Sequence, residues 1–294
     1  MNVNKSHILL HFVILIWGFT GILGKLISIP SESIVWYRML IAFVSLGAYL
    51  QFRKKSMVVT NAQLVNYVLT GMVVALHWVL FFEAIKVSNV SVTLATLASA
   101  TLFTSIIEPL FFRKRVIPYE LLFGLLVIIG LGMIFTFETA YTLGILYALG
   151  SAFCASLFTT INGKFIENKG NATSITLYEM MGGVVGVSAY FLLTSQWEMF
   201  AQIPLALDWV YLLILGVLCT AFAFVASVEV MKELSPYTVS ISINMEPIYA
   251  ILLALFFFGE EERMTPQFYF GAFLIMSTIF ANGWLKKRMK SKVS

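Results

Sequence analysis

Residues 209–230, WVYLLILGVLCTAFAFVASVEV, contain one charged side chain, Glu229. A run of roughly 20 apolar residues is the length that an α-helix needs to cross the hydrocarbon core of a bilayer. The whole chain is similar, since 60% of its 294 residues are apolar and 12% are charged, whereas soluble domains have about 45–50% and about 25%. Such a composition would place large apolar patches on a water-exposed surface. The sequence therefore predicts an all-α integral membrane protein.

Further runs of this kind predict ten transmembrane helices. Ser235-Pro236 and Thr265-Pro266 are typical of an N-cap hydroxyl followed by proline at the first helical position. Residues 1–6 are too polar, and the first run too long, for a cleavable signal peptide, so the first run is expected to remain as a helix. The connections are too short for an appended catalytic domain. The predicted spans are 7–28, 33–52, 64–85, 90–112, 118–137, 142–163, 173–195, 209–230, 236–258 and 266–285.

Lys and Arg are distributed unevenly between alternate connections. Of 19 such residues, 15 fall on the side that holds both ends of the chain, including the clusters at 53–55, 113–115 and 286–292. Because cytoplasmic loops carry an excess of Lys and Arg, both termini are expected in the cytoplasm. The same distribution makes the basic clusters an orientation signal, and nucleic acid is not expected as a partner.

The two halves of the chain resemble each other at a spacing of 139–147 residues. The stretch 20–27 matches 159–166, Gly71 matches Gly216, and Lys86 matches Lys232. We expect one five-helix repeat over 1–140 and a second over 141–294. Because five is an odd number, the second repeat must enter the membrane inverted, which is the architecture of alternating access. This arrangement favours a carrier over an enzyme.

The ten spans and the repeat-end spacing of Pro247, Glu260, Pro266 and Gly271 resemble the EamA-type drug/metabolite transporters. Trp17-Gly18, Arg38 with Ala42, and Ala84-Ile85-Lys86 match as well. The resemblance covers nearly the whole chain and implies secondary transport, commonly export, of amino acids, other small metabolites or drugs through a central cavity. The chain departs from the family pattern at Thr101, where proline is usual, and at Lys114, which stands where Glu260 stands in the second copy.

Glu246 is the leading candidate site residue, because it lies near the middle of the span 236–258, on one face with Ser242 and Tyr249. Ionisable groups at this depth are costly and usually functional. Glu246 could bind a substrate ammonium or carry a coupling proton; the alternative is a structural hydrogen bond to a neighbouring helix. We expect substrate near the midplane, with walls from the third, fourth, eighth and ninth spans. The predicted substrate-binding residues are Glu246, His77, Trp78, Thr96, Ser99 and Asn244.

Arg38 and Glu179 occupy corresponding positions in the two repeats, which suggests a matched pair of gating helices. Arg38 could hold a substrate carboxylate, but the outer interface is within its reach, and we favour an interfacial side chain. His77 could equally be a satisfied packing residue. Glu246, Arg38, Glu179, Pro109 and Pro247 are the predicted coupling or gating residues, the prolines because each frees a carbonyl and allows bending.

Other features of the sequence have structural interpretations. Gly182-x-x-x-Gly186 is a helix-packing motif, and the run Glu260-Glu261-Glu262 is interpreted as a solvated outer loop. Four aromatic residues, each with a low expectation, are candidates for cavity walls: Trp17, Phe158, Phe222 and Phe224. Lys25 and Lys164 are interpreted as interface anchors. Cys154 and Cys219 lie in apolar runs, so no disulfide framework, metal site or cofactor is expected.

The sequence thus predicts a ten-span exporter of a small metabolite, multi-pass in a bacterial inner membrane. A drug carrier or a nucleotide-sugar carrier of the same fold is the alternative, although the latter should offer more cationic residues than Arg38. An integral membrane transferase would need convergent acid, base or metal groups. A passive channel would show no counter-transport. Substrate identity, coupling to a proton or counter-substrate, and oligomeric state are left open.

Overall fold

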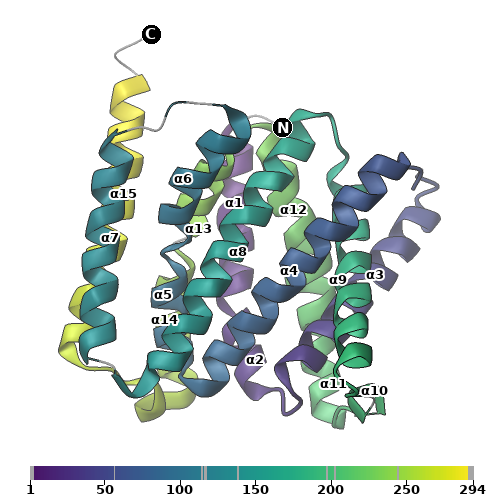
Figure 1. Ribbon diagram of the computed structural model, residues 1–294, viewed down its shortest axis with the longest axis horizontal. Helices are drawn as coiled ribbons and strands as arrows, with labels where there is room; N and C mark the ends of the chain where they lie inside the picture. Colours follow the sequence, from purple (N-terminus) through teal and green to yellow (C-terminus); the bar gives the residue numbers. More distant parts are fainter. Residues whose placement is uncertain are drawn as a thin grey trace.

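Every regular element in the described part of the chain is a helix. The computed structural model describes residues 3–290 except 56, 114, 116, 117, 138, 197, 202 and 244, and its helices form one bundle (Figure 1). The α-helices are α1 (Val3–Gly18), α2 (Thr20–Leu26), α3 (Ser31–Phe52), α4 (Asn61–Val87), α5 (Val90–Leu97), α6 (Ala100–Phe112), α7 (Pro118–Phe137), α8 (Thr142–Glu167), α9 (Ala172–Leu193), α10 (Glu198–Ala201), α11 (Ala206–Leu213), α12 (Ala223–Glu229), α13 (Pro236–Ile243), α14 (Glu246–Phe258) and α15 (Pro266–Lys290). The remaining helical segments are η1 (Thr139–Tyr141), the π-helix η2 (Ile214–Phe222), η3 (Val230–Lys232) and η4 (Gly259–Glu262).

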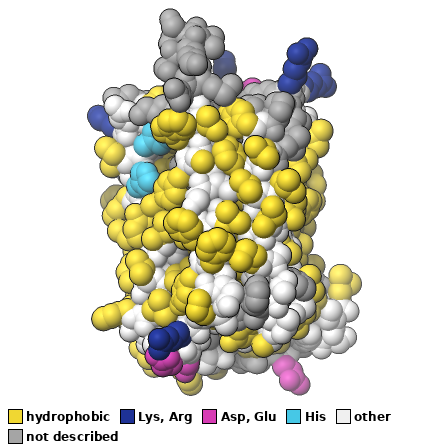
Figure 2. Space-filling view, turned by 90° about the vertical axis from the view of Figure 1, so that its left-hand side faces the viewer, with side chains coloured by type: hydrophobic (Ala, Val, Ile, Leu, Met, Phe, Trp, Pro, Cys, Tyr) yellow, Lys and Arg dark blue, Asp and Glu magenta, His cyan; other side chains and the backbone are white. Residues whose placement is uncertain are grey.

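Eight helical segments of the described chain are long and apolar enough to cross a membrane. The two other predicted spans coincide with α7 and α15, which lie along each other at one edge of the bundle (Figure 1). Figure 2 shows hydrophobic side chains over the middle of that face and charged side chains towards its two ends. This is the surface that a bilayer requires, and the chain is a multi-pass membrane protein. The eight segments are Val3–Leu26, Ser31–Phe52, Asn61–Val87, Val90–Phe112, Thr139–Glu167, Ala172–Leu193, Ala206–Lys232 and Pro236–Glu262.

Two helix starts follow the local sequence signals. Ser235 Oγ accepts a hydrogen bond from the N–H of Thr238 at 3.2 Å, and α13 begins at the intervening Pro236. Thr265 Oγ1 accepts in the same way from the N–H of Phe268 at 3.2 Å, just before α15. Each hydroxyl satisfies one backbone donor that the first turn leaves unpaired. Both predicted N-caps are confirmed.

Several predicted spans are not continuous α-helices. The first is interrupted at Phe19, the fourth at residues 98–99 and the ninth between α13 and α14, while the eighth passes through the π-helix η2. At the fourth-span break the N–H of Ser99 donates to the carbonyl of Thr96 at 3.0 Å, a three-residue spacing tighter than an α-turn. The apolar runs thus coincide with spans that are interrupted inside the bundle.

The ninth-span break changes the surroundings predicted for Glu246. Glu246 is the first residue of α14, and Pro247, which follows it, has no N–H to extend an α-helical ladder from α13. Ser242, on α13, donates its hydroxyl to the carbonyl of Thr238 at 2.8 Å. Ser242 therefore does not share one regular helical face with Glu246, and this part of the prediction is wrong. Tyr249 lies three residues after Glu246 on α14 and does share its face.

The broken spans repeat the same segment lengths in the two halves of the chain. α5 and α13 each have 8 residues and begin 146 residues apart, and α6 and α14 each have 13 residues at the same separation. α3 and α9 each have 22 residues. In Figure 1 the chain passes upward from α5 to α6 and downward from α13 to α14. The two broken spans thus run in opposite directions.

Helices α4 and α9 cross closely because α9 presents glycines at the crossing. A Cβ at Gly182 would collide with the backbone of Val68, and one at Gly186 would press on Met72. Gly71 of α4 lies in the same way against the carbonyl of Glu179. The predicted packing role of the Gly182-x-x-x-Gly186 motif is confirmed, and this crossing fixes the position of Glu179 relative to α4.

This crossing predicts a contrast between two glycine substitutions. Gly182→Ala should lower the free energy of unfolding by about 1–3 kcal/mol, because the added methyl forces the backbones apart. Gly47→Ala is the matched control, since a Cβ there meets nothing within 4 Å, and it should stabilise by about 0.4–1 kcal/mol. Thermal unfolding of both variants in the same detergent checks the prediction. Equal effects would contradict the close crossing.

Candidate functional site

A cavity of about 90 Å³ lies inside the bundle, where the helix breaks meet. At about 10–15 Å³ for each water, this space holds roughly six to nine water molecules. Interrupted helices leave backbone groups free to face such a cavity, whereas they cannot face lipid. The residues on either side of three breaks line it: Trp17 and Thr20, Ala98 and Ala100, and Ile243 and Glu246.

Arg38 of α3 points into this cavity. It is 1% exposed, and its Nε and Nη2 donate to Thr220 Oγ1 at 3.0 and 2.8 Å. Its guanidinium carbon lies 3.8 Å from the centroid of the Trp78 ring, and Nη1 has no partner among the described residues. The interpretation of Arg38 as an interfacial side chain is therefore wrong. A planar, weakly hydrated guanidinium that stacks on an aromatic ring suits this inward position.

Glu246 lies in the same cavity as Arg38 but is not its ion-pair partner. It is 6% exposed and begins α14, where the helix dipole favours a carboxylate. None of the ion pairs between described residues joins it to Arg38, although the two charges interact electrostatically. The cavity therefore presents one acidic and one basic group that do not neutralise each other by direct contact.

His77 of α4 is fixed by Ser151 of α8. Its Nδ1 lies 2.9 Å from the Ser151 carbonyl oxygen and 2.8 Å from Ser151 Oγ, while Ser151 Oγ donates to the His77 carbonyl at 2.9 Å. Because a carbonyl only accepts, the neutral ring carries its proton on Nδ1. This leaves Nε2 as an acceptor on a residue that lines the cavity. The packing and the binding interpretations of His77 thus both have support.

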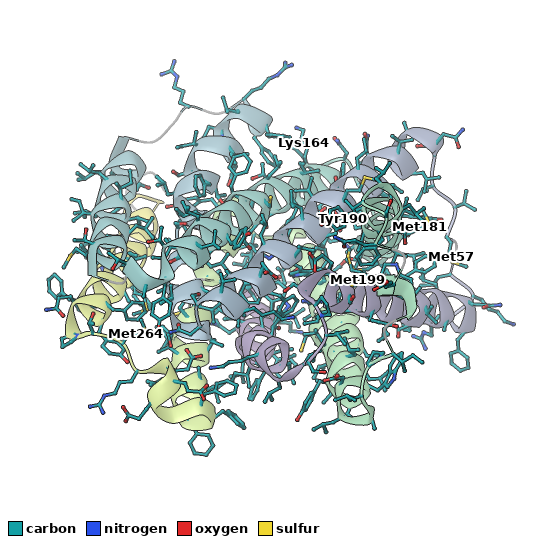
Figure 3. All side chains as sticks on the ribbon, turned by 60° about the horizontal axis from the view of Figure 1, so that its bottom comes forward. Met57, Lys164, Met181, Tyr190, Met199 and Met264 are labelled. Carbon is teal, nitrogen blue, oxygen red and sulfur yellow. The ribbon has the colours of Figure 1, made fainter. Side chains whose placement is uncertain are left out.

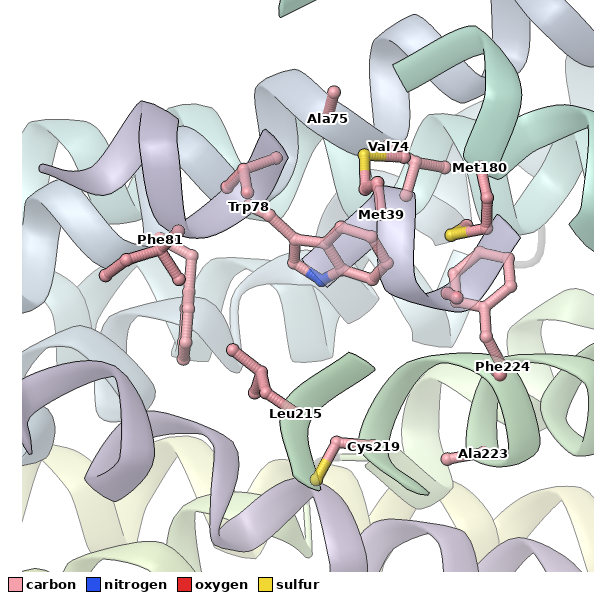
Figure 4. Packing of buried hydrophobic residues seen from close by; sticks show 14 of the residues in the cluster. Met39, Val74, Ala75, Trp78, Phe81, Met180, Leu215, Cys219, Ala223 and Phe224 are labelled. Atoms are coloured by element: carbon pink, nitrogen blue, oxygen red, sulfur yellow. The ribbon is translucent and has the colours of Figure 1, made fainter. Parts of the chain in front are cut away.

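Aromatic rings make up much of the cavity wall. Figure 4 shows the Trp78 indole between Phe81, Met39 and Phe224, and the Trp78 and Phe224 centroids are 5.8 Å apart. Phe158 lies beside His77 and Phe224, with centroid distances of 5.3 and 5.7 Å. Trp17, Phe158 and Phe224 line the cavity, whereas Phe222 is 44% exposed on the outside.

The other predicted site residues lie in different places. Pro247 lines the cavity. Thr96 and Ser99 are fully buried, with hydroxyls that have no partner among the described residues, but neither lines the cavity. Pro109 lies inside α6 and Glu179 lies on α9, and neither lines the cavity. Asn244 is outside the described residues.

The cavity also has polar lining residues that the sequence analysis did not select. They are Thr20, Thr159, Asn162, Ser227 and Ser240. Asn162 had a usable signal, because an amide inside the apolar run 142–163 needs a buried partner or a cavity. The hydroxyl residues had none, since a serine or threonine in a membrane helix commonly bonds to its own backbone.

A polar network surrounds Glu262 of η4, where this segment meets the start of α5. Glu262 is fully buried and accepts hydrogen bonds from the N–H groups of Val90 and Ser91 at 3.1 and 2.9 Å. Lys25 pairs with it at 3.0 Å and with Glu261 at 3.1 Å. The interpretation of 260–262 as a wholly solvated loop is therefore wrong: Glu262 caps the α5 N-terminus.

Further side-chain contacts join the helix ends and loops at this end of the bundle, the lower end in Figure 1. Ser28 Oγ donates to Asp208 Oδ2 at 2.6 Å, and Ser31 Oγ donates to Glu83 Oε2 at 2.7 Å. Asn89 Nδ2 donates to the sulfur of Met264 at 3.2 Å; Met264 is labelled in Figure 3, which brings this end forward.

The upper end has a related contact, in which a carboxylate of the first half of the chain caps a helix of the second half. Glu108 of α6 accepts a hydrogen bond from the N–H of Tyr237, in the first turn of α13, at 2.7 Å. A carboxylate near a helix N-terminus satisfies free backbone donors and the helix dipole together. The fourth and the ninth spans thus each have their first helix, α5 or α13, capped by a carboxylate from the other half of the chain.

One family model matches most of the chain, and the chain is similar to bacterial proteins named as transporters. The model of the EamA-like transporter family matches residues 4–136 and again 142–284. The uncharacterized transporter YxxF of Bacillus subtilis is 22% identical over 268 residues, which cover 87% of this chain and 83% of that protein. An uncharacterized transporter of Haemophilus influenzae is 24% identical over 277 residues, or 88% of each chain. A solved crystal structure has the same fold, with a TM-score of 0.69 over 97% of this chain and 99% of the other at 14% identity.

The hydrogen bonds of Glu262 predict a contrast in stability between substitutions of two neighbouring acidic residues, Glu262 and Glu260. Glu262→Gln should lower the free energy of unfolding by about 1.5–3 kcal/mol, because it weakens charged hydrogen bonds in a buried place. Glu260→Gln should change it by less than about 1 kcal/mol, since Glu260 is exposed and its ion pair among the described residues is with exposed Arg263. Thermal unfolding in detergent checks both variants. A Glu262→Gln protein as stable as Glu260→Gln would contradict the capping role.

Proposed function

The chain belongs to the EamA-like transporter family, and on this premise we propose that it is a secondary transporter of amino acids or related small metabolites. Membership makes it a membrane transporter rather than an enzyme. The observation that carries the substrate class is the presence of Arg38 and Glu246 in one cavity without a direct ion pair. A zwitterion offers a carboxylate for the first group and an ammonium for the second.

The size and the walls of the cavity support this substrate class. Its volume of about 90 Å³ corresponds to a molecule of roughly six to nine heavy atoms by the volume of a water. The unpartnered Nη1 of Arg38 is a free donor for a carboxylate. Trp17, Trp78 and Phe224 supply apolar surface for a side chain and for an ammonium over an aromatic face. In this proposal His77 accepts a hydrogen bond through Nε2.

We propose that transport proceeds by alternating access of two inverted five-helix repeats, over 1–140 and 141–294. Three findings support this arrangement. The family model matches two successive segments, the broken spans have equal segment lengths, and these spans run in opposite directions (Figure 1). Two halves of one design can exchange their conformations, so inward-open and outward-open states are close in energy. Ten spans follow when α7 and α15 each cross the membrane.

The proposed direction is export across a bacterial inner membrane, with both termini in the cytoplasm. In Figure 1, α1 begins and α15 ends at the upper end, and this end holds most of the Lys and Arg residues. The lower end is then the outer side, where the Glu262 network joins α2 and η4 to the start of α5. Bacterial relatives support the assignment of the membrane.

Other carriers of the same fold remain the alternative proposal. A drug carrier needs a larger apolar cavity, which conformational change could supply. A nucleotide-sugar carrier needs several cations for its phosphates, and Arg38 is the one Lys or Arg among the described residues that line the cavity. The charge balance of the cavity therefore favours a zwitterion over a phosphorylated substrate.

Transport by purified protein in proteoliposomes tests the proposal. Each of the radiolabelled L-amino acids is offered with and without the same unlabelled compound inside. Saturable uptake that internal substrate accelerates is expected for at least one of them, because a carrier reorients faster when loaded. Flux that is not saturable and shows no acceleration would contradict a carrier and favour a channel.

Two substitutions test the substrate groups. Arg38→Gln and Glu246→Gln should each raise the half-saturation concentration by about 10–100-fold, because each removes one charged contact of roughly 1.5–3 kcal/mol. A carboxylic acid without the ammonium group should compete least in Arg38→Gln, which lacks the carboxylate contact. An amine without the carboxylate should compete least in Glu246→Gln, which lacks the ammonium contact. Glu260→Gln is the control, with transport like that of the unmodified protein. Normal half-saturation in both variants, with normal folding, would contradict the proposed zwitterion site.

A further inference from the structure

Glu179 is a buried carboxyl group outside the cavity wall. It lies in α9 and is fully buried. Its Oε2 accepts a weak hydrogen bond from Asn162 Nδ2 at 3.5 Å, and its Oε1 has no partner among the described residues. None of the ion pairs between described residues includes it. An ionised carboxyl in such a place is far more costly than a protonated one.

The groups around Glu179 come from the four helices that pack against α9. Tyr67 of α4 lies close enough for electrostatic interaction, and α8 contributes Asn162. α3 carries Arg38, which is held by contacts inside the cavity, and Glu32 in its first turn. On α12 it is Glu229, which pairs with Lys232. No close cation among the described residues compensates a negative charge on Glu179.

Asn162 connects Glu179 to the cavity. It lines the cavity, and while its Nδ2 donates to Glu179, its Oδ1 has no partner among the described residues. An amide has a donor side and an acceptor side that exchange places when it turns by 180°. An ionised Glu179 can only accept and selects the Nδ2 side. A protonated Glu179 can donate its O–H and selects the Oδ1 side.

We propose that Glu179 is the coupling-proton site of this transporter and that Asn162 is the positioning residue that transmits its protonation state to the cavity. This inference rests on the proposed function as a carrier of ammonium-bearing substrates. When Glu179 is ionised, Asn162 Oδ1 is free to accept from a substrate ammonium. When Glu179 takes a proton from cavity water, its O–H donates to Oδ1, and the amide offers only N–H groups to the cavity.

The consequence is exchange of a proton for a substrate. Protonation of Glu179 removes an acceptor for the ammonium, so it weakens substrate binding, and by reciprocity bound substrate opposes protonation. A proton that enters from the outer side therefore promotes release of substrate there. Loss of the same proton to the cytoplasm restores the acceptor. Proton entry would thus drive export.

The site at Glu179 suits a proton better than a metal ion. Calcium and magnesium require about six or more oxygen ligands. Here the unpartnered oxygens are Glu179 Oε1 and Asn162 Oδ1, with the hydroxyl of Thr176 one turn earlier on α9. The contact between Glu179 and Asn162 supplies too few oxygens for a metal cage, and one carboxyl group is sufficient for one proton.

Infrared spectroscopy of the protein in lipid bilayers tests the proton site without any substrate. The carbonyl stretch of a protonated, buried carboxyl should titrate with pH and be absent in Glu179→Gln. Glu179→Asp should retain a shifted band, which keeps the test usable when the amide variant does not fold. Glu260→Gln, an exposed carboxyl, is the control and should leave the band unchanged. A band unchanged in both Glu179 variants would overturn the proposal.

Transport tests the coupling. Vesicles that are acidic inside should accumulate the transported L-amino acid above equilibrium, because protons leave as substrate enters. Glu179→Gln should lose at least 90% of this accumulation and still exchange internal for external amino acid. Asn162→Leu should lose the same accumulation and also raise the half-saturation concentration for exchange about 10-fold, because it removes an acceptor for the substrate ammonium. Asn162→Leu should also keep the infrared band, which separates the positioning role from the proton site.

The outcomes distinguish the two proposals. Accumulation that persists in Glu179→Gln would overturn proton coupling at this residue. Absence of any amino-acid exchange by the unmodified protein would instead overturn the proposed substrate class, while the infrared band would still decide whether Glu179 binds a proton.

Discussion

The hydrocarbon core of a bilayer offers no partner to an unpaired backbone group, and the rest of this structure depends on that constraint. It forces the chain into long helices, and it allows a helix to break only where protein or a water-filled cavity surrounds the break. The breaks at Phe19, at residues 98–99 and between α13 and α14 all border one cavity. The place where the helices are least regular is therefore also the place where a polar substrate can be held.

The same constraint explains how charges are placed. Arg38 is tolerated in the bundle because Thr220 and the Trp78 ring take up most of its guanidinium, and Glu246 because it begins a helix. Replacing buried ions by apolar groups is often neutral or stabilising, so two charges that are kept in one small cavity are better explained by binding than by stability. Glu179, which has neither type of compensation, fits a group that changes its charge.

At each end of the bundle a helix N-terminus of one half of the chain is capped by a carboxylate of the other half. Glu262 accepts from the first N–H groups of α5, and Glu108 accepts from the first turn of α13. In both cases the carboxylate comes from the other half of the chain, so each contact ties the halves together at one end. Both contacts are present together in this structure, so the two halves are joined at both ends of the bundle.

The sequence by itself determined the class of protein, the positions of its helices, the N-caps at Ser235 and Thr265 and the glycine crossing of α9, because these depend on composition, length and local spacing. It also pointed to Glu246, His77, Trp78 and Arg38, since ionisable and aromatic groups in apolar runs are conspicuous. Only the tertiary structure decided that Arg38 turns inward, that Glu262 is buried, that the ninth span is broken and that Asn162 joins Glu179 to the cavity. Those features depend on which side chains of distant segments meet, and a pattern along one chain does not record that.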